Sequence, residues 1–223
     1  MITLSFCLDF YSIPDIINNL DFVTVPSYDF QTPERNSKEA DHPAPIYELN
    51  ERLPENNINY QVQYWLGQST PASKIIVSIP TFGRSWQLET DSTATGVPPI
   101  LGVENPGEEG QQSKQPGLMS YPEICSKLPN AANNNLKGAD APLRKVNDPS
   151  KRFGQYAYRL PDADGKFGFW VGYDDPESAG NKGMYVKNKS LGGIAINDIA
   201  YDDFRGSCSG DKFPILRAAK FRI

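Results

Sequence analysis

A Gly-Gly pair at residues 192–193 introduces a short apolar run, residues 194–196. An apolar run of this length after glycines is typical of a strand that is buried on both faces. The polar and acidic residues that follow it are Asn197, Asp198, Asp202 and Asp203. Parallel α/β folds, and barrels above all, place their ligand chemistry at the carboxyl ends of such strands. Segment 191–208 therefore predicts a parallel sheet and directs the search for function to strand ends.

Short apolar runs alternate with helical segments in the first part of the chain. We expect strands at 2–6, 22–28 and 75–79, and helices at 14–20, 43–50 and 60–66. This alternation is the βαβ pattern, which indicates a parallel sheet with helices outside it. A further helix is expected at 175–188, because a proline occupies its first turn, and it leads into the run at 194–196.

The composition changes between residues 87 and 170, where Gly, Pro, Gln, Asn and Ser become frequent. Alternating runs at 155–159 and 167–171, joined through 162–165, are typical of an antiparallel hairpin. We interpret this part of the chain as an inserted α+β domain. The predicted domains are therefore 1–86, 87–170 and 171–223, and the first and third together form the parallel α/β unit.

The charge balance excludes two classes of partner. The chain has 22 basic and 27 acidic side chains, which gives a formal net charge of -5. It therefore lacks the basic footprint by which proteins bind nucleic acid or anionic membranes. No apolar stretch approaches the roughly 18 residues of a membrane-spanning helix, and residues 1–10 lack the basic n-region of a signal peptide.

Histidine and cysteine usage argues against metal and triad chemistry. His42 is the only histidine, so neither a Ser-His-Asp triad nor a histidine-based zinc site is expected, and its loop predicts a surface position. The cysteines Cys7, Cys125 and Cys208 lack metal-ligand spacing. They allow one disulfide and one odd thiol, and the spacing leaves the pair open. We expect no metal and no cofactor.

Four motifs occur in the order found in one enzyme family. They are Tyr28-Asp29, 71–86 (PASKIIVSIPTFGRSW), 170–178 (WVGYDDPES) and 192–206, which begins Gly-Gly-Ile and ends Asp-Asp-Phe-Arg-Gly. In these motifs the chain resembles the second half of a family 18 glycoside hydrolase, a chitinase-type barrel. It resembles more closely the imaginal disc growth factors, the secreted chitinase-like proteins of insects, in segments 29–35, 40–41, 45–51, 136–144 and 212–216. The resemblance covers essentially the whole chain.

The resemblance implies the C-terminal half of a (β/α)8 TIM barrel, strands 5 to 8, with an inserted α+β chitinase insertion domain. Residues 2–6 match the fifth strand and 194–196 the eighth. The family's catalytic motif, Asp-x-x-Asp-x-Asp-x-Glu, belongs to the fourth strand, and this spacing of carboxylates does not occur in the sequence. Because the motif's glutamate protonates the leaving oxygen in this substrate-assisted hydrolysis, we predict no catalytic residue.

A half-barrel leaves strand edges unpaired and an apolar face open to water. We therefore expect the sequence to be part of a longer gene product. The alternatives are pairing with a second copy or with a separate N-terminal half.

Three positions of the family's sugar cleft can be carried over individually, namely Tyr28, Asp29 and Arg84. Tyr28 and Asp29 match the end of the Met-x-Tyr-Asp motif, where the methionine is Pro26 here, and a proline inside a central strand predicts local strain or a bulge. Arg84 matches the arginine of Tyr-Gly-Arg, whose tyrosine is Phe82 here. The alternative for Phe82 and Arg84 is a structural role, with Phe82 in the core and Arg84 paired to a carboxylate between domains.

Asn197 stands where the family has the tryptophan that forms the floor of the sugar subsite beside the cleaved bond. Sugar rings stack on aromatic faces, and an amide offers only hydrogen bonds, so we predict weak sugar binding there. Asp202 and Asp203 are expected to cap and orient the following helix, because neighbouring strand residues point to opposite faces. The aromatic residues expected in cores are Trp65, Trp86, Tyr121 and Trp170.

Covalent features also follow from the resemblance. Cys125 and Cys208 match a pair that is bridged in these secreted proteins, which leaves Cys7 free. The bridge would tie the insertion domain to the barrel and stabilise the fold by about 4 kcal/mol in the chain-entropy model. Asn188 begins an Asn-Lys-Ser sequon and is a predicted glycosylation site.

The sequence predicts a non-catalytic, secreted chitinase-like protein. Its expected roles are in cell growth and proliferation or in immune and cuticle-related responses, with weak binding of chitin or chito-oligosaccharide and with a cell-surface receptor as a further partner. The alternatives are a fragment of an active chitinase that hydrolyses β-1,4-N-acetylglucosamine polymers, and a half-barrel that acts alone as an interaction domain.

Overall fold

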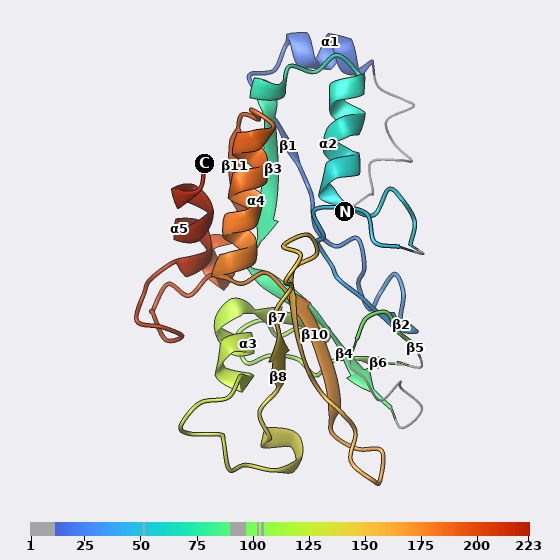
Figure 1. Ribbon diagram of the computed structural model, residues 1–223, viewed down its shortest axis with the longest axis vertical. Helices are drawn as coiled ribbons and strands as arrows, with labels where there is room; N and C mark the ends of the chain where they lie inside the picture. The colour runs from blue at the N-terminus through green and yellow to red at the C-terminus, as the bar shows by residue number, and fades with distance from the viewer. Residues whose placement is uncertain (1–11, 51, 90–96, 102, 104) are drawn as a thin grey trace.

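Two main sheets organise the molecule, one parallel and one antiparallel (Figure 1). This computed structural model describes residues 12–50, 52–89, 97–101, 103 and 105–223. The α-helices are α1 Ile13–Asn18, α2 Ile58–Gly67, α3 Tyr121–Lys127, α4 Pro176–Asn188 and α5 Pro214–Phe221. The strands are β1 Val23–Val25, β2 Glu39–Ala40, β3 Ile75–Pro80, β4 Phe82–Leu88, β5 Ile100–Leu101, β6 Asn105–Pro106, β7 Leu118–Ser120, β8 Arg144–Val146, β9 Gln155–Arg159, β10 Gly168–Tyr173 and β11 Gly193–Asn197.

The parallel sheet has the strand order β1-β3-β11, with Val23 opposite Ile75 and Ile194 opposite Val77. Ile75, Val77 and Ile79 of β3 are fully buried, as expected for β-branched residues in a central strand. Helices α2 and α4 lie along this sheet, and α5 packs against α4 (Figure 1). The predicted strands at 75–79 and 194–196 are confirmed.

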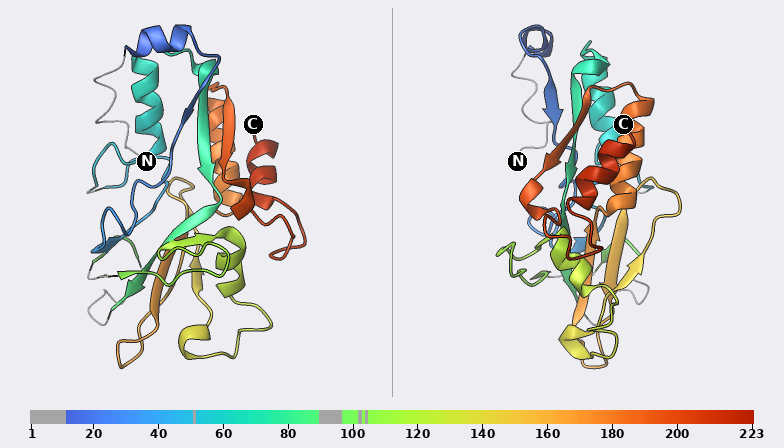
Figure 2. Two further views of the ribbon diagram at one scale, coloured as in Figure 1. Left: turned by 180° about the vertical axis from the view of Figure 1, so that it is seen from behind. Right: turned by 90° about the vertical axis from the view of Figure 1, so that its left-hand side faces the viewer.

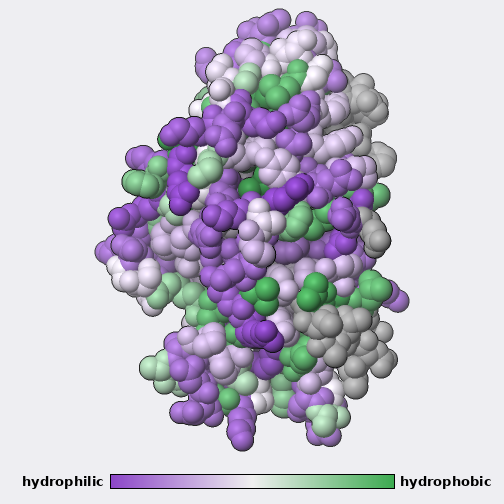
Figure 3. All heavy atoms as spheres, viewed as in Figure 1, coloured by the Kyte–Doolittle hydropathy of each residue, from purple (hydrophilic) through white to green (hydrophobic). Residues whose placement is uncertain are grey.

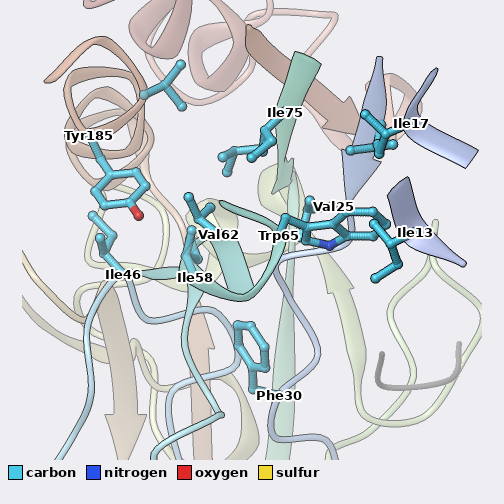
Figure 4. Close-up of a cluster of buried hydrophobic side chains, with 13 residues drawn as sticks. Ile13, Ile17, Val25, Phe30, Ile46, Ile58, Val62, Trp65, Ile75 and Tyr185 are labelled. Atoms are coloured by element: carbon cyan, nitrogen blue, oxygen red, sulfur yellow. The ribbon is translucent and has the colours of Figure 1, made fainter. Parts of the chain in front are cut away.

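An apolar cluster packs α1, α2 and α4 against β1 and β3. Figure 4 shows Val62 and Trp65 of α2 and Tyr185 of α4 gathered around Ile75. Each fully buried aliphatic side chain of this kind stabilises the fold by about 1.5–3 kcal/mol. The predicted helices at 60–66 and 175–188 are confirmed. α4 begins where predicted because the Asp175 side chain accepts a hydrogen bond from the Ser178 backbone N–H.

The antiparallel sheet has the order β6-β4-β10-β9-β8, with β7 also paired to β4. The predicted hairpin is confirmed as β9 and β10, in which Trp170 lies opposite Tyr158. The chain enters this sheet directly, since β4 starts two residues after β3 ends, as the continuous ribbon in Figure 2 shows. On one face Trp86 and Trp170 pack edge to face at 5.6 Å between ring centroids, and both are fully buried. A third, two-stranded sheet pairs β2 with β5.

The loop between β11 and α5 joins the two main sheets. A disulfide links Cys125 of α3 to Cys208, with 5.9 Å between their Cα atoms, and so ties the antiparallel sheet to this loop. Asp202 accepts hydrogen bonds from the backbone N–H groups of Ile215 and Leu216, in the first turn of α5. Asp203 accepts them from Ser207 Oγ and from the Cys208 N–H. The capping role predicted for Asp202 is confirmed, and Asp203 orders the loop.

Three local predictions are wrong. Residues 43–50 form no helix, because prolines occupy positions 43 and 45 and the Ile46 N–H is bonded to the Arg152 carbonyl at 2.7 Å. Pro26 follows β1 instead of lying inside a strand, since β1 ends at Val25. His42 is buried, with 6% of its surface exposed, because Phe153, Tyr156 and Trp170 surround it. The predicted strand 2–6 and Cys7 lie outside the described residues.

Polar side chains cover most of the face seen in Figure 3, and apolar side chains form small separate groups on it. Among the described residues, no helix combines the length and the apolar character needed to cross a bilayer. The same residues contain no group of three or more His, Cys, Asp and Glu side chains arranged to hold a metal ion.

Candidate functional site

The structure places the predicted site residues at one end of the parallel sheet. Tyr28 and Asp29 follow β1, Arg84 lies in β4 just beyond β3, and Asn197 is the last residue of β11. In the register, Asn197 lies opposite Pro80 of β3. Because parallel strands end on the same side, these residues belong to one edge of the sheet. A backbone hydrogen bond also joins the end of β11 to Thr81, the residue between β3 and β4: the Thr81 N–H donates to the Asn197 carbonyl at 3.0 Å.

A buried ion pair forms the centre of the site. Arg84 donates from Nε and Nη2 to the two carboxylate oxygens of Asp29, both at 2.7 Å, in the fork geometry that gives strong charged hydrogen bonds. The side chains are 11% and 9% exposed. Burial acts to lower the pKa of Arg84, but the hydrogen bonds and charge of Asp29 outweigh it and raise that pKa. The structural alternative for Arg84, pairing with a carboxylate from another element, is confirmed.

The pair is held in place by its backbone and its neighbours. Asp29 has a φ of 58°, the left-handed region that aspartate tolerates better than most residues. Its carbonyl accepts a hydrogen bond of 2.5 Å from Arg35 Nη1. Glu34 lies 3.9 Å from Arg84 Nη1 and is about half exposed. The site therefore presents one cation shared between two carboxylates.

Aromatic rings pack around Phe82 beside this pair. Tyr28 meets Phe82 edge to face at 5.7 Å, and Tyr201 does so at 6.3 Å. The Arg84 guanidinium lies 5.3 Å from the Phe82 ring centroid, within cation–π range. Burial, and then the charge of Asp29, raise the pKa of Tyr28. The core role predicted for Phe82 is confirmed, since only 7% of its surface is exposed.

Sequence reasoning missed Tyr201. It lies in the short 3-10 helix η5 Ile199–Tyr201, which begins when the Asp198 carboxylate accepts a hydrogen bond from the Ala200 N–H. An aspartate that starts a turn three residues before a tyrosine is a usable signal, because the turn brings the ring back toward the strand end.

Asn197 differs from the other predicted site residues. Its side chain is exposed and forms no hydrogen bond with any other described residue. Tyr28, Asp29 and Arg84 are buried or nearly so. Asp29 and Arg84 are bonded to each other, and Tyr28 packs against Phe82. Asn197 is therefore the predicted residue that is free to meet a ligand.

The carboxylates near the strand ends are poorly suited to donate a proton. Both oxygens of Asp29 accept hydrogen bonds from Arg84, and Asp198 accepts one from the Ala200 N–H. Burial acts to raise the pKa of Glu34, but hydrogen bonds from its own backbone and Thr32, with the charge of Arg84, lower it overall. Glu34 therefore stays ionised at neutral pH. This arrangement can bind polar groups, and its carboxylates are engaged as hydrogen-bond acceptors.

The remaining predicted residue, Asn188, is exposed as the last residue of α4, where a glycan would have room. Its modification stays a prediction.

The comparisons with known proteins agree on one family. Residues 4–202 match the family described as Glycosyl hydrolases family 18. The chain is 61% identical over 214 residues to "Chitinase-like protein Idgf4" of Glossina morsitans morsitans, a match that covers 96% of this chain and 48% of that protein. It is 53% identical over 214 residues to "Imaginal disk growth factor 6" of Drosophila melanogaster, covering 96% and 47%. The chain spans about half the length of the curated relatives it matches.

Among solved structures, the chain superimposes on human YKL-39 with a TM-score of 0.77 and 29% identity, covering 95% of this chain and 53% of that one. That structure is described as a pseudo-chitinase with retained chitooligosaccharide binding properties. The predicted resemblance to imaginal disc growth factors is confirmed, and the fold is the mixed α/β fold of chitinases.

Proposed function

This chain belongs to glycosyl hydrolase family 18, and we propose that it is part of a secreted, non-catalytic chitinase-like protein that binds chito-oligosaccharides weakly. One observation carries the proposal. Asn197, an exposed amide without a partner among the described residues, ends β11 where a sugar ring would need an aromatic floor. The pseudo-chitinase that superimposes on this chain is described as retaining such binding.

The geometry supports binding without hydrolysis. The Asp29 carboxylate and the Arg84 guanidinium are hydrogen-bonded to each other. Phe82 lacks the hydroxyl group that a tyrosine would present. The exposed side chains of Asn197 and Glu34 would supply hydrogen bonds to sugar hydroxyls. We expect a dissociation constant on the order of 1 mM for a chitotetraose, equivalent to about 4 kcal/mol of binding free energy.

We propose that β1, β3 and β11 are the sixth, seventh and eighth strands of a (β/α)8 barrel, with the antiparallel sheet as its insertion domain. The order β1-β3-β11, with all strands parallel and helices α2 and α4 between successive strands, supports this. The half-buried strand β11 would then pack against strands from the remainder of a longer protein.

The proposed role outside the cell is in growth or in immune and cuticle-related responses, through a cell-surface receptor. It rests on the names of the relatives, which are chitinase-like proteins and growth factors. The disulfide between Cys125 and Cys208 supports an oxidising compartment, where such bonds persist. Loss of mass after glycosidase treatment of the protein secreted from insect cells, absent in Asn188→Gln, would place a glycan on Asn188.

The deciding experiment measures binding and hydrolysis on the full-length protein. We expect no release of fluorophore from a chitobiose substrate, and a weak, saturable heat of binding for chitotetraose. Asn197→Trp should lower the dissociation constant at least about tenfold, since stacking adds about 1.5 kcal/mol or more. Asn134→Trp, at an exposed asparagine far along the chain, is the matched control and should change nothing.

The competing function is an active chitinase. Steady turnover of the chitobiose substrate would establish it and refute the non-catalytic proposal. A non-hydrolysing protein whose affinity for chitotetraose is unchanged by Asn197→Trp would instead refute the proposed sugar site at β11.

A further inference from the structure

A cavity of about 260 Å³ opens on one face of the antiparallel sheet. One wall is a row of side chains from three adjacent strands, because Phe169 of β10 pairs with Gln87 of β4 on one side and with Arg159 of β9 on the other. The other walls come from the loop after β6, the end of α3, the 3-10 helix η4 Gly138–Asp140 and the turn between β9 and β10, at the lower end of Figure 1. The cavity shares no lining residue with the site at the strand ends of the parallel sheet.

The partly buried guanidinium of Arg159 is held in a fixed position beside this cavity. Its Nε donates to the Phe167 carbonyl at 2.6 Å, and its Nη1 donates to the carbonyls of Ala139 and Ala141 at 2.9 and 2.6 Å. Within the described part of the chain, its Nη2 forms no hydrogen bond, and this nitrogen keeps some exposed surface. Arg159 therefore has one terminal nitrogen available to a ligand, and its orientation is set before any ligand arrives.

The charge of Arg159 is less well balanced than that of Arg84. Arg84 has the Asp29 carboxylate at 2.7 Å, and its pKa is raised. Arg159 forms no ion pair with any described carboxylate. Burial lowers the pKa of Arg159, and the charges of Glu108 and Asp140 offset this effect only in part. Because a guanidinium stays protonated in proteins, an anion that enters the cavity would stabilise it.

Two lysines add to the positive charge of the cavity. Lys127, in the last turn of α3, places its Nζ 5.9 Å from the centroid of the Phe169 ring, beside the row of strand side chains. Lys166 lies in the turn between β9 and β10. Both lysines are exposed, and neither forms an ion pair with a described carboxylate. Glu108 is the acidic residue of the cavity lining, so three cations face one carboxylate in a chain whose formal net charge is -5.

A phosphate group matches these donors better than a carboxylate does. The three cations come from three different elements, with Arg159 in β9, Lys127 in α3 and Lys166 in the turn between β9 and β10. A carboxylate has two oxygens in one plane, whereas a phosphate monoester offers three acceptor oxygens around a tetrahedral centre and up to two charges. The amide of Gln87, which forms no hydrogen bond with other described residues, is a further donor. The volume lies just below the range of about 300–1,000 Å³ typical of drug-sized ligands, so it suits a single small group.

We propose that this cavity binds a phosphate group, held by Nη2 of Arg159 and by the ammonium groups of Lys127 and Lys166. The group is inorganic phosphate or the monoester of a small molecule, and both sources make the same contacts. Glu108 lines the same cavity and repels the ligand, which keeps the affinity modest. This site is independent of the function proposed above, because it uses no residue of the strand-end site.

The test is calorimetric titration of the full-length protein at neutral pH with inorganic phosphate, glycerol phosphate and acetate, at matched ionic strength. We expect saturable binding of one or both phosphates, with a dissociation constant in the millimolar range that rises as sodium chloride is added. Binding of glycerol phosphate alone identifies a monoester as the ligand, and binding of inorganic phosphate alone identifies the free ion. Acetate should bind at least about fivefold more weakly, a difference of about 1 kcal/mol. No saturable binding of either phosphate, or equal binding of acetate, overturns the proposal.

Variants then locate the bound phosphate in this cavity. Lys127→Gln removes one cation and should raise the dissociation constant about threefold, whereas Glu108→Gln removes the opposing carboxylate and should lower it about threefold. Both side chains are exposed and form no ion pair with described residues, so neither variant should disturb the fold. The matched control is Lys220→Gln, since Lys220 is also exposed in the last turn of a short helix, α5, but lies outside the cavity. Equal effects of Lys127→Gln and Lys220→Gln, or no effect of Glu108→Gln, would place the phosphate elsewhere and overturn the assignment.

Discussion

The antiparallel and parallel sheets differ in how completely they are buried. Every residue of β10 is buried, with Trp170 in the cluster on one face of its sheet and Val171 in the cluster on the other. β11, an edge strand of the parallel sheet, is only half-buried from Gly193 to Ile196. The antiparallel sheet therefore holds its own core, whereas the parallel sheet keeps an accessible side. Of the predicted ligand-contacting residues, Tyr28, Asp29 and Asn197 lie at the strand ends of the less buried sheet, and Arg84 lies in β4 of the other.

The largest expected effect tests this difference directly. Trp170→Ala removes a fully buried indole from between Trp86 and Tyr156 and should lower the free energy of unfolding by about 4 kcal/mol. Ile196→Ala in β11 should cost about 1 kcal/mol, because its side chain is only partly buried. Urea unfolding monitored by circular dichroism measures both. Equal losses would contradict the contrast between the sheets.

The next effect is a pH dependence confined to the antiparallel side. Burial lowers the pKa of His42 from 6.5 to about 4, so the unfolded chain takes up a proton before the folded one does. The contribution of His42 to the free energy of unfolding is complete above pH 6.5 and is lost as the pH falls to about 4. This contribution is about 3 kcal/mol, because a pKa difference of one between the folded and unfolded states corresponds to about 1.36 kcal/mol.

His42→Gln serves as the reference for this prediction, because it removes the titrating ring while the carboxylates of the chain remain. The difference in unfolding free energy between the two proteins should change between pH 6.5 and 4 and be flat at higher pH. A difference that is constant throughout this range would mean that His42 keeps its ordinary pKa in the folded state.

The boundary between the sheets can be weakened at Arg84. Arg84→Gln leaves the Asp29 carboxylate nearly buried without its cation and should cost about 2 kcal/mol. The double variant with Asp29→Asn should recover part of this loss, since no charge then remains unpaired. Arg217→Gln is the matched control, because its pair with Asp211 is about two-thirds exposed on both sides. Thermal unfolding measures the stability of the two single variants and the double variant. Equal losses of stability for Arg84→Gln and Arg217→Gln would refute a structural role for the ion pair of Arg84 with Asp29.

Regular elements could be predicted from sequence because their signals are local. Asp175 and Pro176 set the start of α4, and the apolar residues of β3 set a buried strand. His42 and the helix expected at 43–50 could not be predicted. Both depend on contacts from distant residues, such as the Arg152 carbonyl that accepts the Ile46 N–H and the rings around the imidazole. The site was predicted as separate residues, but the bidentate pairing of Arg84 with Asp29 required the fold.

The smallest expected effect concerns a second link between the sheets. Lys145 of β8 donates to Asp175 at 2.7 Å, while the other oxygen of Asp175 caps α4. The Lys145 side chain is 34% exposed, so Lys145→Met should cost less than about 1 kcal/mol. A double-mutant cycle with Asp175→Asn, which keeps the cap, isolates the pair. A coupling above about 1.5 kcal/mol would mean that this ion pair, like Arg84 and Asp29, holds the two sheets together, and that the antiparallel sheet depends on α4 for part of its stability.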